Sequence, residues 1–141
     1  MAEPTKQRIA RLVRVIAVTL ALALGLRGLG YIGPAAPSHV PDSLNPLEGL
    51  LPLQVWAVAC FVIAATVLAG VLYRRAVYVL GLTAYCAING AWIGSYLTSW
   101  SFGYSDRAWI TALNYCPELV AAIVLLIIGP ARPLLRKRNH E

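Results

Sequence analysis

The sequence predicts an all-α integral membrane protein, a bundle of four transmembrane helices with both chain ends in the cytoplasm. Of its 141 residues, 59% are hydrophobic and only 13% are charged, whereas about a quarter of a soluble domain is charged. The apolar residues fall into four runs, each long enough to cross a hydrocarbon core of ~30 Å as a helix. We therefore expect a single membrane domain, 1–141, with spans at about 12–33, 51–73, 76–98 and 107–129.

The basic residues predict the orientation of these spans. Lys and Arg precede the first run, fill the short turn at Arg74 and Arg75, and recur in the C-terminal tail 130–141. The other two connections carry only Arg107. Because positively charged loops stay in the cytoplasm, both termini are expected on the cytoplasmic side of the cell inner membrane.

The same charge pattern predicts the partners of the protein. The net charge of +6 is concentrated at the ends of the apolar runs, so we expect no nucleic-acid binding. Anionic lipids are the expected partner of the cytoplasmic tail, with docking to a partner protein as the alternative. The basic residues of this tail are Arg132, Arg136, Lys137 and Arg138.

The start of the chain fits two interpretations, a cleaved signal peptide or a first transmembrane span. The charged start followed by an apolar run also fits a cleaved secretory signal, but the run continues past Arg27 and we favour an uncleaved span. In the loop after this run, prolines at 34, 37, 41 and 46 exclude a long helix. The loop ends in a typical helix start, with Asn45 as the capping residue, Pro46 at the first helical position and Glu48 in the first turn. This order predicts a short interfacial helix leading into the second span.

Four polar residues inside the spans form the candidate site. Arg27, Asn89, Asn114 and Glu118 all fall in the outer half of the membrane in the expected orientation. An ionised side chain in hydrocarbon normally has a partner, so we expect Glu118 to face the bundle interior and to be held by Arg27 or Asn114. The cluster fits three roles. It could be an internal staple, meaning interhelical hydrogen bonds that hold the bundle together; a proton or ion pathway through Glu118; or a hydrophilic face that reorganises when copies associate.

Small and aromatic residues predict how the helices pack. Gly90 and Gly94 form a GxxxG motif in the third span, which is typical of helix packing in membranes. The second span has small residues at similar spacing, for example Thr66 and Gly70. The outer ends of the spans are rich in Trp and Tyr, which predicts an aromatic belt at the interface. Its expected members are Trp92, Trp100 and Trp109 with Tyr31, Tyr96 and Tyr104.

No residue pattern predicts catalysis, a cofactor or a metal. His39 and Asp42 are two possible ligands on a proline-rich loop, too few for a metal site, and His140 stands near the chain end. No serine or cysteine has a plausible base nearby. The three cysteines lie inside apolar runs, where we expect them to act as small hydrophobic residues. We therefore expect a protein that is not an enzyme.

One segment carries a resemblance to a known class of proteins. The segment YSDRAWITALNY at 104–115, together with four spans and a basic tail, resembles the small holin-like membrane proteins encoded near the lysis genes of actinobacterial phages. The excess of Arg over Lys fits such a GC-rich source. This resemblance implies a homo-oligomer in the cytoplasmic membrane that permeabilises it at a set time.

Two other classes stay open as alternatives. DoxX-like proteins are four-helix membrane bundles of about this length, and the local similarity consists of the basic turn at 73–76 and the glycines at 25, 28 and 30. An accessory subunit of a larger bacterial membrane complex would need only apolar, well-packed helices. Induced expression with measurement of the membrane potential separates these classes.

Overall fold

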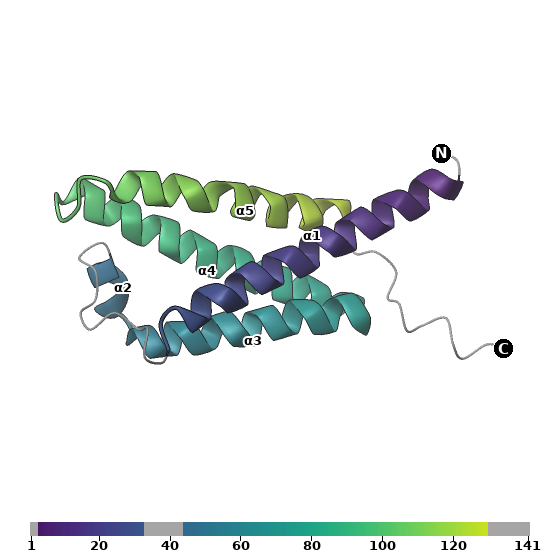
Figure 1. The fold of residues 1–141 in the computed structure, drawn as a ribbon, viewed down its shortest axis with the longest axis horizontal. Helices are drawn as coiled ribbons and strands as arrows, with labels where there is room; N and C mark the ends of the chain where they lie inside the picture. The colour runs from purple at the N-terminus through teal and green to yellow at the C-terminus, as the bar shows by residue number, and fades with distance from the viewer. Residues whose placement is uncertain (1–2, 33–43, 130–141) are drawn as a thin grey trace.

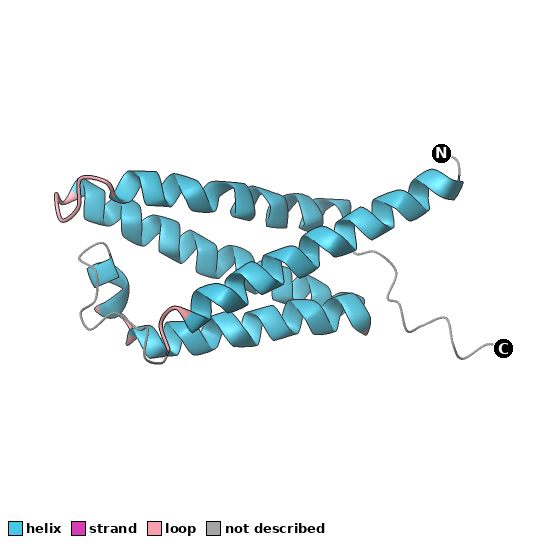
Figure 2. Ribbon diagram, viewed as in Figure 1, coloured by secondary structure: helices cyan, strands magenta, loops and turns pink. Residues whose placement is uncertain are grey.

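The computed structural model describes residues 3–32 and 44–129; residues 1–2, 33–43 and 130–141 are outside the described part. Within that part the chain is helical and contains no strand (Figure 2). The helices, in chain order, are α1 (Glu3–Leu29), α2 (Asn45–Glu48), α3 (Leu53–Leu72), α4 (Arg75–Ser101) and α5 (Ala108–Ile128).

The prediction of four long apolar helices is confirmed. Among the described residues, α1, α3, α4 and α5 are long and apolar enough to cross a membrane. The short helix expected near Asn45 is also present, as α2. The first span differs most from its predicted range of 12–33, because α1 begins at Glu3 and ends at Leu29. Arginine side chains are good helix formers, so the basic segment before the apolar run extends the helix rather than interrupting it.

The helices pack in chain order (Figure 1). α1 packs along α3, α3 along α4, and α4 along α5, whereas α1 touches α5 only slightly. α1 runs diagonally across the view, and the short α2 packs against α4. As a result, α4 lies between two long neighbours, and α5 has a single extensive neighbour.

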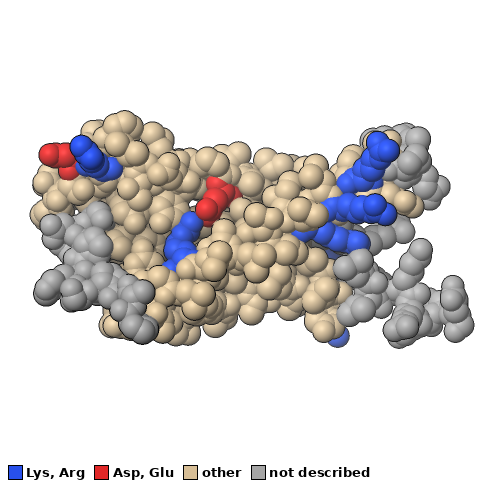
Figure 3. All heavy atoms as spheres, in the orientation of Figure 1, with Lys and Arg blue, Asp and Glu red and all other residues tan. Residues whose placement is uncertain are grey.

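The ends of the helices are distributed as the predicted topology requires. The N-terminal end of α1, the turn between α3 and α4 and the C-terminal end of α5 lie at one end of the molecule. The connection between α4 and α5 lies at the other end, together with α2. Figure 3 shows several basic side chains gathered at the first of these ends. The side of the membrane that each end faces stays a prediction.

Close packing between α3 and α4 depends on two glycines. A Cβ added at Gly70 would overlap the backbone of Tyr78, and one added at Gly81 would lie 2.8 Å from the backbone nitrogen of Val67. Real Cβ atoms do not approach a backbone nitrogen this closely. The absence of a side chain at both positions therefore lets the two helix backbones come together, as small residues commonly do in membrane bundles.

Candidate functional site

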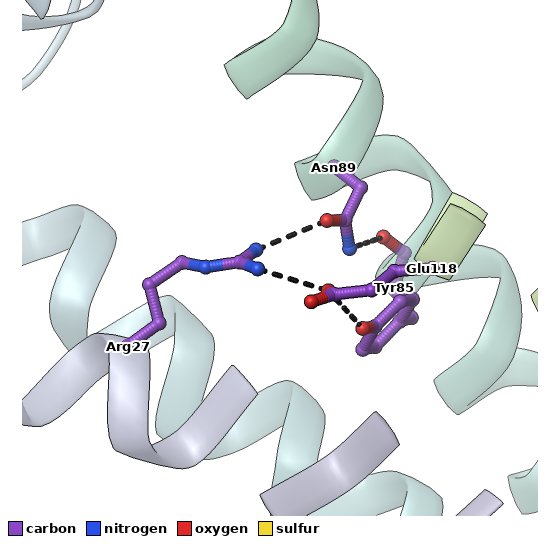
Figure 4. Close-up of polar contacts among 4 residues, drawn as sticks. All are labelled: Arg27, Tyr85, Asn89 and Glu118. Carbon is purple, nitrogen blue, oxygen red and sulfur yellow. Dashed lines mark hydrogen bonds and ion pairs between the residues drawn. The ribbon is translucent and has the colours of Figure 1, made fainter. Parts of the chain in front are cut away.

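The polar cluster is assembled from three helices that the sequence separates widely. Arg27 lies in the last turn of α1, Tyr85 and Asn89 lie one turn apart in the middle of α4, and Glu118 lies halfway along α5. Hydrocarbon offers no hydrogen bonds to these side chains. Their polar groups can be satisfied by turning toward one another, and Figure 4 shows that they do so.

Arg27 joins α1 to both of the other helices (Figure 4). Its Nη2 lies 2.9 Å from Glu118 Oε2 and forms a salt bridge with it, and its Nη1 donates to Asn89 Oδ1 at 3.0 Å. Such charge-assisted hydrogen bonds are stronger than those between neutral groups. Of the two partners expected for Glu118, Arg27 or Asn114, the structure shows Arg27.

Two further hydrogen bonds fix the partners of this salt bridge. The Tyr85 hydroxyl donates to Glu118 Oε2 at 2.8 Å, and Asn89 Nδ2 donates to the carbonyl oxygen of Tyr85 at 3.0 Å. Tyr85 and Asn89 are both fully buried. The carboxylate is therefore bound from two helices at once, and the amide that binds the guanidinium is held in orientation by its own helix.

The salt bridge is buried on one side and accessible on the other. The side chain of Arg27 is 13% exposed and that of Glu118 is 27% exposed. Figure 3 shows one basic and one acidic group in contact midway along the molecule, while the other charged groups in this view lie toward its two ends. The second carboxylate oxygen of Glu118, Oε1, accepts no hydrogen bond from the residues that the structure describes. The cluster thus faces the bundle interior but leaves one acceptor open.

Aromatic rings surround the outer side of the cluster. Arg27 Cζ lies 4.0 Å from the centroid of the Tyr115 ring, a cation–π contact. Tyr115 stacks on Tyr96 with centroids 5.6 Å apart, Tyr96 lies 6.4 Å from Trp92, and Trp92 stacks on Tyr31 at 5.3 Å. Because Tyr31 follows Arg27 by four residues, these contacts connect α5 through α4 back to the end of α1.

This arrangement corrects the aromatic-belt prediction in part. Trp92 is fully buried and Tyr96 nearly so, so neither can sit in a belt at the membrane surface. Trp100 and Trp109 are 50% and 41% exposed, as belt residues would be. Trp92 differs from them because it lies on the same face of α4 as Tyr85 and Asn89, which the neighbouring helices cover.

The structure does not bring Asn114 into the cluster. Its side chain is exposed, whereas the cluster side of α5 is formed by Ala112, Tyr115 and Ala122. Asn114 and Glu118 are four residues apart and therefore about 40° apart around the helix. The buried side of α5 is centred beyond Glu118, so Glu118 reaches the interior and Asn114 points outward.

Two members of the site were not assigned to it by sequence reasoning. The spacing of Tyr85 and Asn89 places both on one face of the third span, but Tyr85 was given no role in the cluster, and Tyr115 was not singled out. Tyr85 precedes Asn89 by four residues, and Tyr115 precedes Glu118 by three. Both spacings place side chains on one side of a helix and were the available signal.

Gly90 and Gly94 lie on the outside of the described bundle. Both are exposed, and a Cβ added at either would meet no atom within 4 Å. The helix contact expected of these glycines is therefore not made within the chain, where Gly70 and Gly81 serve instead. Contact between copies through Gly90 and Gly94 stays a prediction.

The remaining candidate residues fall into two groups. His39, Asp42, His140 and the basic tail (Arg132, Arg136, Lys137, Arg138) lie outside the described residues. Within the described part, no three His, Cys, Asp or Glu side chains lie close enough together to hold a metal ion. The cysteines there are free; Cys60 is buried as expected, and Cys86 and Cys116 are partly exposed.

The geometry of the cluster is that of an internal staple. Arg27, Glu118, Asn89 and Tyr85 bind one another across α1, α4 and α5. A proton path through the membrane would need a second acid or a histidine deeper in the bundle. Between the cluster and the end of the bundle that holds Arg74, the described spans contain neither an acidic residue nor a histidine.

Comparisons with protein families, with curated proteins and with solved structures find no match to this chain.

Proposed function

We propose that the protein is a non-enzymatic membrane protein that acts by associating with further copies of itself in the cytoplasmic membrane. We propose further that the assembly permeabilises this membrane, as a holin does. The observation that supports association is the outward face of α4. Beside exposed Val79, Leu80 and Leu97, this face carries a run of small residues that nothing in the described chain covers, namely Thr83, Ala87, Gly90 and Gly94.

Such a face favours contact between helices in lipid. Hydrocarbon tails are as apolar as leucine, so helices in a membrane associate through close van der Waals packing rather than through the hydrophobic effect. Gly90 and Gly94 are one turn apart, and the space above both is free within 4 Å. A second helix can therefore approach the α4 backbone along more than one turn.

The polar cluster supports action by assembly rather than by chemistry. Its donors and acceptors are used mainly to hold α1 against α4 and α5. The part that is not enclosed, the partly exposed pair of Arg27 and Glu118, supplies polar surface on the side of the bundle. A water-filled lesion formed by several copies needs polar surface of this kind on its lining.

The proposal places both chain ends in the cytoplasm, and cysteine labelling tests this. Arg75 and Ser101 are exposed at opposite ends of α4. With Cys60, Cys86 and Cys116 replaced by alanine, Ser101→Cys should react with an impermeant maleimide added to intact cells. Arg75→Cys should react only after the membrane is opened. The reverse pattern would contradict the proposed orientation.

Induced expression in a bacterial host tests the function itself. Permeabilisation predicts that the membrane potential collapses abruptly after a lag, and that a co-expressed cytoplasmic endolysin then reaches the cell wall. Gly90→Leu and Gly94→Leu should lengthen the lag, because a bulky side chain separates the contacting helices. Val62→Leu, which adds bulk at an exposed position of α3 rather than on the outward face of α4, is the matched control and should leave the lag unchanged.

Two results would count against this proposal. A stable membrane potential in cells with abundant inserted protein would contradict permeabilisation. Stoichiometric co-purification with a respiratory or transport complex would favour the accessory-subunit alternative, in which the outward face of α4 contacts a different protein.

A further inference from the structure

The outward face of α5 carries a polar side chain that its own bundle does not use. α5 packs extensively only against α4, so much of its surface is free. Asn114 lies on this free surface, exposed and without a hydrogen bond to the residues that the structure describes. The same side of the helix carries a stripe at alternating spacings of four and three residues, of which all but the partly buried Ala121 are exposed: Ile110, Asn114, Pro117, Ala121, Val124 and Ile128.

The position of Asn114 makes this exposure costly in a membrane. It lies six residues after Ala108, so roughly 9 Å below the start of α5 at 1.5 Å per residue. Trp109, exposed near that start, is the type of residue that marks the membrane surface. The Asn114 amide therefore lies within hydrocarbon, where a polar group that lacks hydrogen bonds loses several kcal/mol. A partner that supplies both a donor and an acceptor removes this cost.

A second copy of the chain meets this requirement by symmetry. Copies inserted in the same orientation are related by a two-fold axis along the membrane normal, so identical residues meet at identical depth. An amide is both donor and acceptor, so two Asn114 side chains can satisfy each other across the axis. The spacing of four and three residues is the one that brings two parallel helices together along a seam.

The surroundings of Asn114 fit the same partner. Asp106 and Arg107 are adjacent and exposed just before α5, and they offer opposite charges to the same two residues of a second copy. One turn after Asn114, Glu118 Oε1 accepts no hydrogen bond from the described residues and provides a further acceptor beside the seam. Ala121, the small residue of the stripe, allows close approach.

We propose that α5 forms a two-fold contact with α5 of a second copy, in which the two Asn114 side chains hydrogen-bond to each other inside the membrane. The inference rests on the proposed function, because it names a surface through which copies associate. It adds a second interface to the outward face of α4. Two different interfaces on one chain allow assemblies larger than a dimer, as a permeabilising lesion requires.

Cysteine cross-linking in native membranes tests the seam. In the cysteine-free background, Ile110→Cys and Val124→Cys lie on the stripe and should form disulfide-linked dimers with a mild oxidant. Val120→Cys and Ile127→Cys are exposed at comparable positions off the stripe and are the matched controls, which should cross-link weakly. Equal cross-linking on and off the stripe would overturn the proposed contact.

The role of Asn114 is tested by substitution with a chemical control. Asn114→Leu should weaken the Val124→Cys dimer about tenfold, since it removes both hydrogen bonds of the amide pair between the helices. Asn114→Gln keeps the amide and should retain most of the dimer. Because Asn114 is exposed in the single chain, both variants should fold normally. Undiminished dimer in Asn114→Leu would refute the role of the amide.

The outcomes separate this inference from the proposed function. If cross-links form through Ala87→Cys on the outward face of α4 but not through the α5 stripe, the inference fails and the proposed self-association stands. If neither face cross-links and the protein runs as a single chain in mild detergent, the proposed self-association itself fails.

Discussion

The two faces of α4 carry different kinds of side chain, large ones on the buried face and small ones on part of the exposed face. The inward face carries large aromatic and polar side chains, Tyr85, Asn89, Trp92 and Tyr96, all of them buried. The outward face carries Thr83, Ala87, Gly90 and Gly94, all of them exposed. A soluble helix usually places its polar residues outside, whereas here the amide and the tyrosine hydroxyls are inside.

The difference shows which contacts determine how the helices of a membrane bundle pack against one another. In a membrane the surroundings of such a bundle are hydrocarbon, where polar side chains gain their hydrogen bonds only from one another. Arg27 and Glu118 reach the inward face of α4 for this reason and connect three helices there. The outward face has no such bonds to make within the chain, and it is free to contact other molecules.

The largest effect on stability is expected from a methyl group added on the buried side of α4, and it is compared with a methyl group added on the outward face. Gly81→Ala places a Cβ 2.8 Å from the Val67 backbone nitrogen, and overpacking of this kind costs about 1–3 kcal/mol. Gly90→Ala meets no atom within 4 Å and should leave stability unchanged or slightly higher. Unfolding by SDS in mixed micelles measures both variants, and equal losses of stability would remove the distinction between the faces.

A loss within the same range is expected from breaking the salt bridge on one side. Arg27→Leu leaves the Glu118 carboxylate without its charged partner, and because the pair is partly exposed we expect a loss of ~2 kcal/mol in the free energy of unfolding. Arg27→Leu combined with Glu118→Leu removes both charges and should recover much of that loss. A double mutant whose loss equals the sum of the two single losses would contradict a direct pair.

The smallest effect is expected from the Tyr85 hydroxyl. Tyr85→Phe removes the hydrogen bond to Glu118 Oε2 and keeps the ring, and interhelical hydrogen bonds in membranes average ~0.6 kcal/mol. Tyr104→Phe, at an exposed position after α4, is the control and should be neutral. The same SDS titration measures both, and a neutral Tyr85→Phe would show that the bond contributes nothing to stability.

The sequence was sufficient for the coarse fold and for the central pair. Four apolar runs predicted the four long helices, and the need of Glu118 for a partner predicted Arg27 or Asn114, of which the structure shows Arg27. Both follow from the physics of hydrocarbon, which requires long helices and paired charges. These inferences need no knowledge of how the helices are rotated about their axes.

The errors concern helix rotation. Asn114 was expected inside and Trp92 in an interfacial belt, yet Asn114 is exposed and Trp92 is buried. Periodicity shows which residues share a face, but packing decides which face is covered. On α5 the rotation is set by Ala112, Ala122 and Leu125, which are buried. The glycine contacts that matter within the chain, at Gly70 and Gly81, likewise depend on which helices become neighbours.

Counting the copies in a bilayer tests most directly the claim that the inward face of α4 maintains the fold and the outward face associates. The protein, labelled with one fluorophore per chain and reconstituted at low density, should show two or more photobleaching steps per spot. Gly90→Leu combined with Gly94→Leu should lower the number of steps per spot, to at most the two that a pair joined through α5 gives, while the SDS unfolding transition stays unchanged. Single steps for the unaltered protein, or the same step distribution in both proteins, would contradict the account.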